Sequence, residues 1–565
     1  MIACKRVVII GGTGVFGKRL ARHIAKWPGL EIVLTSRDAA KAQALAAQIA
    51  AEVPGARVSG VALDHRYRLL ETLTALAPWA VVDASGPFQG ADYTTATAAL
   101  RVGAHVLDLA DARDYLAGYG AALNGLALEK GLVALAGASS TPALSGAVVA
   151  ALTQGWTRVD TIDIAITPGG QSEVGPAVIE AILTYAGKPI PAWRNGALGQ
   201  SIGWENGRWV AMPGLGRRLV AAVETLDPQD LGPRYRVQSR VSFSAGLESL
   251  PEQLGLMALA RLRRWGFFQN LKTWVPWLLH GRKLTRLITS DRGGMRVEIT
   301  GLDGAGQATR ARWSLVVGQN HGPNIPTLPA AAALKALLGE TLPPGARAAT
   351  EALPLAAIEA EMAPYAIRVT HDPPVKLSSP VAQALGTAGL ACLPAPLQSF
   401  HADDSPRFWE GRATVETGAS PLTRLIARGL NLPRAGEDIP VIVEIEDVTP
   451  PGGPPAQRWS RSFAGRRFSS RLAVGPTGTL RERFGPFRFH LGLVPSTEAL
   501  GLSVDGWDFC GLPLPKSLAP RADARESLDA TGRFYADIGL TLPVFGLLVR
   551  YRTWLVAKRA GETSA

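Results

Sequence analysis

A glycine-rich turn near the start of the chain is the first feature that could do chemistry. The residues Gly12-Thr13-Gly14-Val15-Phe16-Gly17 follow a β-branched run, Arg6–Ile10, and precede a stretch with helical spacing, Lys18–Lys26. Such a turn between a strand and a helix lets backbone N–H groups approach a pyrophosphate. The sequence therefore predicts a dinucleotide site, with an ordinary strand–helix turn as the alternative.

The end of the second expected strand, Glu31–Thr35, indicates which dinucleotide binds. A site for NAD carries Asp or Glu at this point to bond the ribose 2′-hydroxyl. Here the chain reads Thr35-Ser36-Arg37-Asp38 instead. The guanidinium of Arg37 can pair with a 2′-phosphate and Ser36 can add a hydrogen bond, so we predict NADP as the cofactor.

Two further strand ends complete the expected site. Asp64 follows the strand Ala56–Leu63 and is a candidate for the adenine edge. Ser85, Gly86 and Pro87 follow the strand Ala80–Ala84, and we expect them along the nicotinamide half. With strands at His105–Asp108 and Gly131–Ala136, the pattern predicts a doubly wound parallel sheet of six strands, a Rossmann fold.

A hydride transfer also needs a proton donor, and two residues are candidates. Tyr93 lies just beyond the Ser85–Pro87 turn, near the expected nicotinamide face, and a packing role is the alternative. His321 follows Gly318-Gln319-Asn320 after a strand, and a structural role is the alternative for this loop histidine.

The length of 565 residues predicts about three domains. We place a Rossmann domain at 1–150, an α+β domain for substrate binding and dimerisation at 151–372, and a β-rich α+β domain at 380–565. The middle domain is expected to hold an antiparallel sheet from Val159–Thr167, Arg234–Phe243 and a hairpin of Met295–Thr300 with Arg310–Val317. We expect Leu353–Tyr365 to pack back on the first domain, and His371–Pro374 to be a linker.

The segment 256–292 carries eight basic residues against one acid, Asp291, together with five Trp and Phe residues. Basic residues among interfacial aromatics are typical of a helix lying on an anionic membrane surface. A substrate lid with its arginine stems packed on apolar surface is the alternative.

Beyond residue 380 we expect a twisted antiparallel sheet or half-barrel with one or two helices, one of them capped by Ser379. The apolar run Leu540–Val549 suits a cup for a hydrophobic ligand or a strand buried in a core. Arg461 and Glu482–Arg483 are candidate polar anchors in such a cup, or a simple cross-strand salt bridge.

Composition excludes several classes of protein. Hydrophobic residues make up 47% and charged residues 19%, which excludes a disordered chain. Cys4, Cys392 and Cys510 are too far apart for a metal site or a disulfide framework, so we expect no metal and a reducing, cytoplasmic compartment. The net charge of +12 favours an acidic partner, but no nucleic-acid motif is present. The uncharged stretch Gly131–Thr157 is interpreted as strand, loop and helix rather than a membrane span.

The motif series of residues 1–150 resembles the saccharopine-dehydrogenase-like oxidoreductases. It consists of GGTGVFG, SR after the second strand, SGPF after the fourth, HVLDLAD and GASSTPALSG. The resemblance implies cofactor contacts at Gly12, Thr13, Gly14, Val15, Phe16, Ser36, Arg37, Asp64, Ser85 and Gly86, and a homodimer. Residues 380–557 resemble an uncharacterised domain found behind such modules.

One departure from the family concerns its acid motif. Members that act on amino acids carry a Gly-Glu pair after the fifth strand, whereas this chain reads Leu107-Asp108-Leu109-Ala110-Asp111, with Asp111 nearest to that acid. We therefore expect an NADP-dependent oxidoreductase acting on a carbonyl, imine or enoyl group of a lipid-like substrate, with peripheral membrane contact through 256–292 at the inner face of the membrane. The alternatives are a non-catalytic NADP-binding scaffold or lipid-binding protein, and amino-acid metabolism of the saccharopine type.

Overall fold

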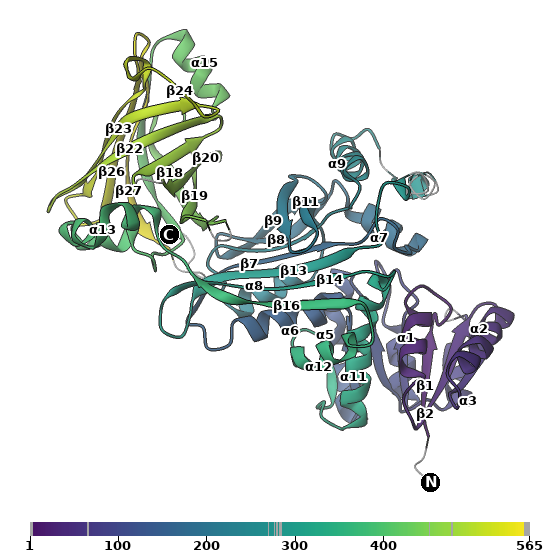
Figure 1. The fold of residues 1–565 in the computed structure, drawn as a ribbon. Helices are drawn as coiled ribbons and strands as arrows, with labels where there is room; N and C mark the ends of the chain where they lie inside the picture. The colour runs from purple at the N-terminus through teal and green to yellow at the C-terminus, as the bar shows by residue number, and fades with distance from the viewer. Residues whose placement is uncertain are drawn as a thin grey trace.

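The computed structural model describes residues 4–64, 67–268, 270–275, 277, 281, 285–450, 453–475 and 478–558. These residues form three sheets of seven, nine and eleven strands, which lie along the molecule from the N-terminal end to the C-terminal domain (Figure 1). The predicted fold classes of the three parts are confirmed, with differences in detail that are given below.

The N-terminal sheet is parallel and has the order β15-β6-β5-β4-β1-β2-β3. Its first six strands are β1 (Lys5–Ile10), β2 (Leu30–Ser36), β3 (Arg57–Ala62), β4 (Ala80–Asp83), β5 (His105–Asp108) and β6 (Val133–Ala136), as predicted. The helices between them are α1 (Gly17–Ile24), α2 (Ala39–Glu52), α3 (Leu69–Leu76), α4 (Thr94–Arg101) and α5 (Arg113–Glu129). Because β1 and β4 lie on either side of the strand-order reversal, their carboxyl ends border the crevice where nucleotides bind in such folds.

A seventh strand, β15 (Gly345–Ala348), comes from much later in the chain and pairs with β6. It lies between α11 (Leu328–Leu338) and α12 (Leu355–Met362), which pack on each other beside α1. The prediction that the segment after residue 353 packs on the first domain is confirmed, because Glu361 contacts His23 of α1 through a hydrogen bond of 2.6 Å.

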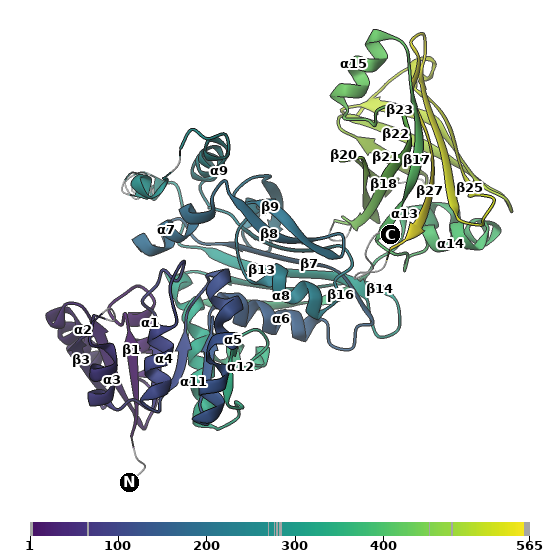
Figure 2. The ribbon, with the colours of Figure 1, turned by 180° about the vertical axis from the view of Figure 1, so that it is seen from behind.

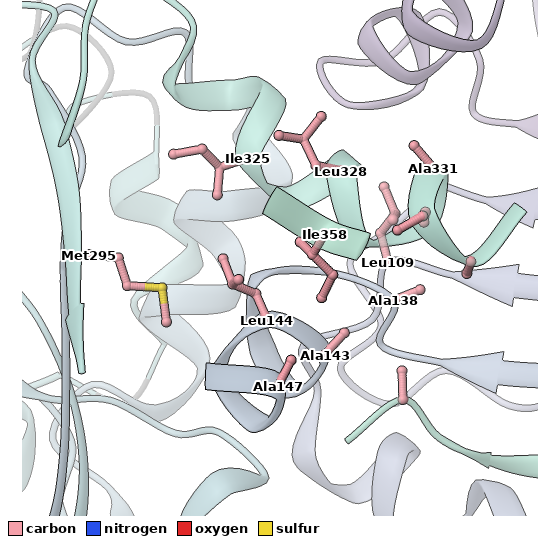
Figure 3. Packing of buried hydrophobic residues seen from close by; sticks show 14 of the residues in the cluster. Leu109, Ala138, Ala143, Leu144, Ala147, Met295, Ile325, Leu328, Ala331 and Ile358 are labelled. Carbon is pink, nitrogen blue, oxygen red and sulfur yellow. The ribbon is translucent and has the colours of Figure 1, made fainter. Parts of the chain in front are cut away.

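The N-terminal and middle parts share one hydrophobic core. In Figure 3, Leu109 and Ala138 of the first domain lie on the same side as Leu328 and Ala331 of α11, with Met295 of the middle sheet across the cluster. These side chains are less than one-tenth exposed. The shared core fixes the middle sheet relative to the strand ends that border the crevice.

The middle sheet is mixed, with the order β10-β11-β12-β7-β13-β14-β16 and the hairpin β8–β9 attached to β12. Its strands are β7 (Arg158–Thr167), β8 (Pro189–Arg194), β9 (Ala197–Ile202), β10 (Arg208–Met212), β11 (Gly216–Ala222), β12 (Arg240–Ala245), β13 (Gly293–Leu302), β14 (Ala308–Val317) and β16 (Ile367–Lys376). The predicted hairpin is β13–β14. The sheet is not purely antiparallel, because β12 pairs in parallel with β7.

Two predictions in the middle part are wrong. Helix α8 (Asp227–Arg234) ends where a strand was expected to begin, and the strand starts only at Arg240, because Pro228 and the acids of the first turn favour a helix here. The expected linker His371–Pro374 lies inside β16, an edge strand. An edge strand tolerates proline, because an N–H that faces away from the sheet is not needed for pairing.

The C-terminal sheet is antiparallel and closes on itself, since β22 pairs with both β21 and β23. Its strands are β17 (Phe408–Thr417), β18 (Gly436–Asp447), β19 (Ala456–Phe463), β20 (Arg466–Val474), β21 (Leu480–Phe484), β22 (Phe487–Pro495), β23 (Leu500–Phe509), β24 (Leu512–Pro513), β25 (Arg521–Leu528), β26 (Phe534–Leu542) and β27 (Gly546–Ala557). The predicted half-barrel is thus a complete ring.

Three helices accompany this ring: α13 (Pro380–Cys392), α14 (Ala395–His401) and α15 (Pro421–Gly429). The predicted cap is confirmed, because the Ser379 hydroxyl accepts a hydrogen bond from the Ala382 N–H. The views of Figures 1 and 2 place α13 at the end of the ring near the middle sheet and α15 at the far end. Arg240 and Ser239 of the middle part contact Glu446 and Glu444 of β18 across the junction.

Within the described ranges, no helix has the length and apolar character needed to cross a membrane. The stretch Gly131–Thr157 holds β6, a short π-helical turn and α6 (Ser145–Leu152), which confirms the expected strand, loop and helix.

Candidate functional site

The glycine turn lies directly beyond β1 and starts helix α1. Gly17 has to be glycine, because a Cβ atom there would lie 2.4 Å from the Gly11 carbonyl oxygen. The Gly12 and Gly14 amides bond to the carbonyls of Thr35 and Gly11 at 3.0 and 2.9 Å. Within the described part of the chain, the N–H groups of Thr13, Val15 and Phe16 have no such acceptor, so this turn can donate hydrogen bonds to a phosphate group.

A cavity of about 550 Å³ opens in front of this turn. Most of the predicted cofactor residues line it, namely Thr13, Gly14, Val15, Phe16, Ser36, Arg37, Ser85, Gly86 and Pro87. Three predicted residues do not: Gly12 and Gly17 lie in the packed base of the turn, and Asp64 follows Leu63, which does line the cavity. One cavity therefore brings together the ends of β1, β2 and β4.

Arg37 stands exposed at the edge of this cavity. Its neighbour Asp38 caps α2 by accepting a hydrogen bond from the Lys41 N–H, and it lies 3.8 Å from the Lys41 ammonium. Among the described residues, Arg37 itself forms no ion pair, so its guanidinium keeps its donors for a bound anion. A ribose 2′-phosphate fits this position by charge and by the fork of N–H donors.

Two buried aspartates, Asp83 and Asp108, support the cavity floor from adjacent strand ends. The Asp83 carboxylate accepts hydrogen bonds from the N–H and hydroxyl of Ser85 at 2.9 and 2.6 Å, and so orients this turn. Asp108 accepts from the N–H groups of Gly137 and Ala110 at 2.7 and 3.0 Å. Burial raises the pKa of Asp108 to about 7. Neither residue was a predicted site residue, although Asp108 ends one predicted strand and Asp83 is the last residue but one of another.

Asp111 is the carboxyl group that reaches the cavity itself. Its Oδ1 accepts a hydrogen bond of 3.2 Å from the side-chain amide of Gln89. The Asp111 side chain is exposed to solvent where it opens onto the cavity, but the surrounding protein atoms partly desolvate its carboxyl group and so raise its pKa above its ordinary value. A carboxyl group with a raised pKa at a cavity wall keeps its proton to higher pH than an ordinary aspartate and can exchange that proton with a bound molecule.

The Gln89 side chain carries a second sign of a ligand. Its Oε1 atom is buried and has no hydrogen-bond partner among the described residues. A buried acceptor without a partner is costly, and a bound molecule that donates to it would remove that cost. With the free N–H groups of the turn and the free guanidinium of Arg37, this wall fits a nucleotide cofactor.

The fourth side of the cavity comes from the middle part of the chain, which was expected to bind the substrate, but no residue of this wall was predicted. Gly175, Val178 and Ala181, at and in helix α7 (Pro176–Tyr185), face the glycine turn. Just before α7, Glu173 pairs with Lys18 and Arg19 of α1 at 2.7 and 2.9 Å. The sequence around a surface glutamate does not indicate a partner so distant in the chain, so these ion pairs could be found only from the fold.

The two predicted proton donors lie elsewhere. The Tyr93 hydroxyl donates to the Tyr115 carbonyl at 3.0 Å, and its ring packs against Tyr115 and Tyr119. The Nδ1 atom of His321 accepts from the Ala366 N–H at 2.9 Å. Neither residue lines the cavity, so the structure brings neither together with the cofactor residues.

Comparisons with known proteins agree with this geometry. Residues 7–135 match the family model of the saccharopine dehydrogenase NADP binding domain, and residues 393–555 match that of a domain of unknown function, DUF4166. The predicted resemblance of the N-terminal part to saccharopine-dehydrogenase-like proteins, the uncharacterised domain behind it, and NADP as the cofactor are thereby confirmed. A comparison with curated proteins gave no match.

Several solved structures are similar over somewhat less than two thirds of the chain. Saccharopine dehydrogenase (L-Glu forming) from Saccharomyces cerevisiae is 13% identical with a TM-score of 0.47, covering 65% of this chain and 100% of its own. A mutant meso-dapdh from Clostridium tetani E88 is 12% identical with a TM-score of 0.34, covering 62% and 95%. An engineered D-amino acid dehydrogenase bound to NADP+ is 14% identical with a TM-score of 0.34, covering 63% and 95%.

Proposed function

Because the chain carries a saccharopine dehydrogenase NADP-binding domain in front of a DUF4166 domain, we propose that it is an NADP-dependent oxidoreductase for an apolar carbonyl, imine or enoyl substrate. One observation carries this proposal: the free guanidinium of Arg37 and the carboxyl group of Asp111 line the same cavity. The Arg37 guanidinium selects NADP over NAD, and the Asp111 carboxyl group donates the proton.

The cofactor-holding roles follow from the cavity wall. Arg37 and Ser36 hold the 2′-phosphate, the turn Thr13–Phe16 holds the pyrophosphate, and Ser85–Pro87 flank the nicotinamide. NADPH supplies a hydride when it is bound. Asp83 keeps the Ser85 turn in place through its two hydrogen bonds.

Asp111 supplies the proton that complements the hydride. Reduction of a carbonyl forms one C–H bond from the hydride and one O–H bond from the proton, which leaves Asp111 as a carboxylate that water reprotonates. Gln89 orients the carboxyl group through its amide. The apolar side chains Val178 and Ala181 of α7 give the substrate a hydrophobic wall, which favours a lipid-like molecule over an amino acid.

The test is a titration of the full chain with NADPH and NADH, followed by nicotinamide fluorescence. The expected result is tighter binding of NADPH, with about tenfold or greater loss in Arg37→Ala and little change for NADH. Arg57→Ala is the control, because Arg57 is exposed at the opposite end of the same sheet. Failure of both nucleotides to bind would exclude the oxidoreductase and also an NADP-binding scaffold.

A peripheral membrane contact is the second candidate activity, and it rests on exposed apolar side chains around α9 (Leu250–Arg264). Leu254 is 50%, Trp265 64% and Phe267 69% exposed, and the exposed Arg261 and Arg264 lie between them in the chain. Large apolar side chains in water beside cations favour insertion into an anionic bilayer. Arg282 and Lys283 of the predicted segment lie outside the described residues.

Co-sedimentation with vesicles tests this contact. The protein is expected to pellet with phosphatidylserine-containing vesicles and to stay in solution with phosphatidylcholine alone. The double variant Trp265→Glu, Phe267→Glu is expected to abolish pelleting. The control is Trp209→Glu, which alters a half-exposed tryptophan on β10 and is expected to leave pelleting unchanged. Equal pelleting of the double variant would rule out this surface.

A further inference from the structure

The closed C-terminal sheet has two ends that differ in packing. Ten strands form the ring, because β24 pairs only with β23. A ring of about eight strands already leaves an interior wide enough to hold side chains or one small ligand. A ring of ten strands is wider, and its interior has to be filled by side chains, by helices or by a ligand.

One end of the ring is filled. Helices α13 and α14 contact strands from both sides of it, β20 to β22 and β25 to β26. Phe400 of α14 stacks on Phe534 with ring centroids 4.0 Å apart and contacts Trp409 and Trp459. These four aromatic side chains are less than one-tenth exposed. This end is therefore an ordinary hydrophobic core.

The inner face toward the other end is apolar and incompletely covered. Alternate residues of several strands pack against the buried core but remain partly exposed, among them Phe468, Phe484, Phe489, Ile538 and Leu540. Solvent reaches a side chain on the inner face of a closed sheet through an open end of the ring. These apolar side chains are thus accessible at the far end of the ring.

Exposed apolar residues also lie on elements at this far end. Leu425 of α15 is 64% exposed, Leu512 of β24 is 69% exposed, and Val544 in the β26–β27 turn is 96% exposed. Figures 1 and 2 place α15 at this end of the ring, away from the middle sheet. Exposed apolar side chains gathered at a rim mark a surface that receives hydrophobic molecules.

One cation lies on the inner face between the two halves. Arg461 of β19 lies over the rings of Trp459 and Phe468, 5.4 and 5.8 Å from their centroids. Its Nη1 donates to the Ser470 hydroxyl at 3.0 Å, and the Glu482 carboxylate is 4.0 Å from its Nη2. This loose pairing leaves N–H donors of a half-buried guanidinium available for an anionic head group.

From these observations we propose that the C-terminal ring binds a long-chain carboxylic acid, with its hydrocarbon chain in the far half and its carboxylate on Arg461. This is a second site, distinct from the cavity of the N-terminal domain, and it does not depend on the proposed oxidoreductase activity. The ligand enters through the rim near α15, because the other end is closed by α13 and α14.

The test uses cis-parinaric acid, whose fluorescence rises in an apolar site, added to the full chain with saturating NADPH. Saturable binding is expected for the natural chain. Leu540→Trp fills the far half and is expected to weaken binding about tenfold or more. Ser469→Trp is the matched control, because Ser469 is exposed on the outer face of β20 next to the inward Phe468. Arg461→Met is expected to weaken binding of the acid but not binding of its methyl ester.

Two outcomes would overturn the proposal. One is the absence of saturable binding to the natural chain; the other is binding that Leu540→Trp and Ser469→Trp affect equally. If Leu540→Trp does not fold, the natural chain still decides the matter, because a bound acid must raise its melting temperature in proportion to the logarithm of its concentration. Loss of NADPH binding in Arg37→Ala would leave all of these results unchanged, so the two proposals fail separately.

Discussion

The side-chain amide of Gln89 donates a hydrogen bond of 3.2 Å to the carboxylate of Asp111, and both residues lie in the wall of the cavity. Gln89 follows the turn after β4 and Asp111 follows β5, so the pair joins two adjacent strand ends. This contact fixes the direction of the only carboxyl group that lines the cavity among the described residues.

Replacing Asp111 by asparagine is expected to lower kcat for reduction by about 100-fold or more while NADPH binding is kept, since general acids contribute about 10²–10⁴-fold. Stopped-flow fluorescence of NADPH oxidation measures the step. Asp114→Asn is the control, because Asp114 is an exposed acid nearby that pairs with Arg113. An unchanged kcat in Asp111→Asn would exclude this residue as the proton donor.

The same residue gives a direction to the pH profile. Because desolvation raises the pKa of Asp111, the protonated form persists to higher pH than for an ordinary aspartate. The rate of reduction is therefore expected to fall as the pH rises through that raised pKa, and the rate of oxidation to rise. Steady-state rates measured in both directions across the pH range would test this; parallel profiles would contradict it.

The ion pairs of Glu173 with α1 join the two sides of the cavity, and we expect them to slow the release of the cofactor. Glu173→Gln removes the ion pairs with Lys18 and Arg19 and is expected to speed NADPH dissociation, with a loss of affinity of about 0.5–1 kcal/mol for partly exposed pairs. Glu340→Gln, which changes another acid outside the site, is the control. If NADPH dissociates equally fast from Glu173→Gln and Glu340→Gln, the ion pairs of Glu173 do not retain the cofactor.

Sequence reasoning is most informative where local signals are strong. The glycine turn, the Ser36-Arg37 pair and the Ser85–Pro87 turn lie at the ends of short buried strands, and a parallel sheet brings such ends together. The Ser379 cap with Pro380 behind it is likewise local, and the helix begins as predicted.

Sequence reasoning could not find the partners that only the fold brings near. Strand β15 reads Gly-Ala-Arg-Ala, which has no β-branched signal, and it is a strand because β6 offers it an open edge. Tyr93 was placed by its distance along the chain from the nicotinamide turn, but its ring turns toward Tyr115 and Tyr119 on α5. Proximity in sequence does not determine the direction of a side chain.

Buried polar contacts of Glu361 on α12 help to hold the segment after residue 353 to the N-terminal part of the chain. Although burial opposes its charge, hydrogen bonds from His23 and Lys335 lower the pKa of Glu361. Glu361→Gln is expected to cost about 1–3 kcal/mol at neutral pH. A lowered carboxyl pKa stabilises the fold above the ordinary pKa of glutamate, so the difference must shrink as the pH falls through that range. Denaturant unfolding at several pH values measures it.

Asp108 predicts the opposite pH dependence. Its pKa of about 7 lies above that of an unfolded aspartate, so the folded state holds a proton that the unfolded state releases between these values. Stability from this group is complete at acid pH and is lost as the pH rises toward 7 and beyond. Asp108→Asn places a neutral side chain beside the Gly137 and Ala110 N–H groups at every pH. Its free energy of unfolding relative to that of the natural chain is therefore expected to rise by a few kcal/mol between about pH 5 and pH 8. Thermal unfolding of both chains at these two pH values measures the gain, and a constant difference in Tm would show that Asp108 is already ionised in the folded protein.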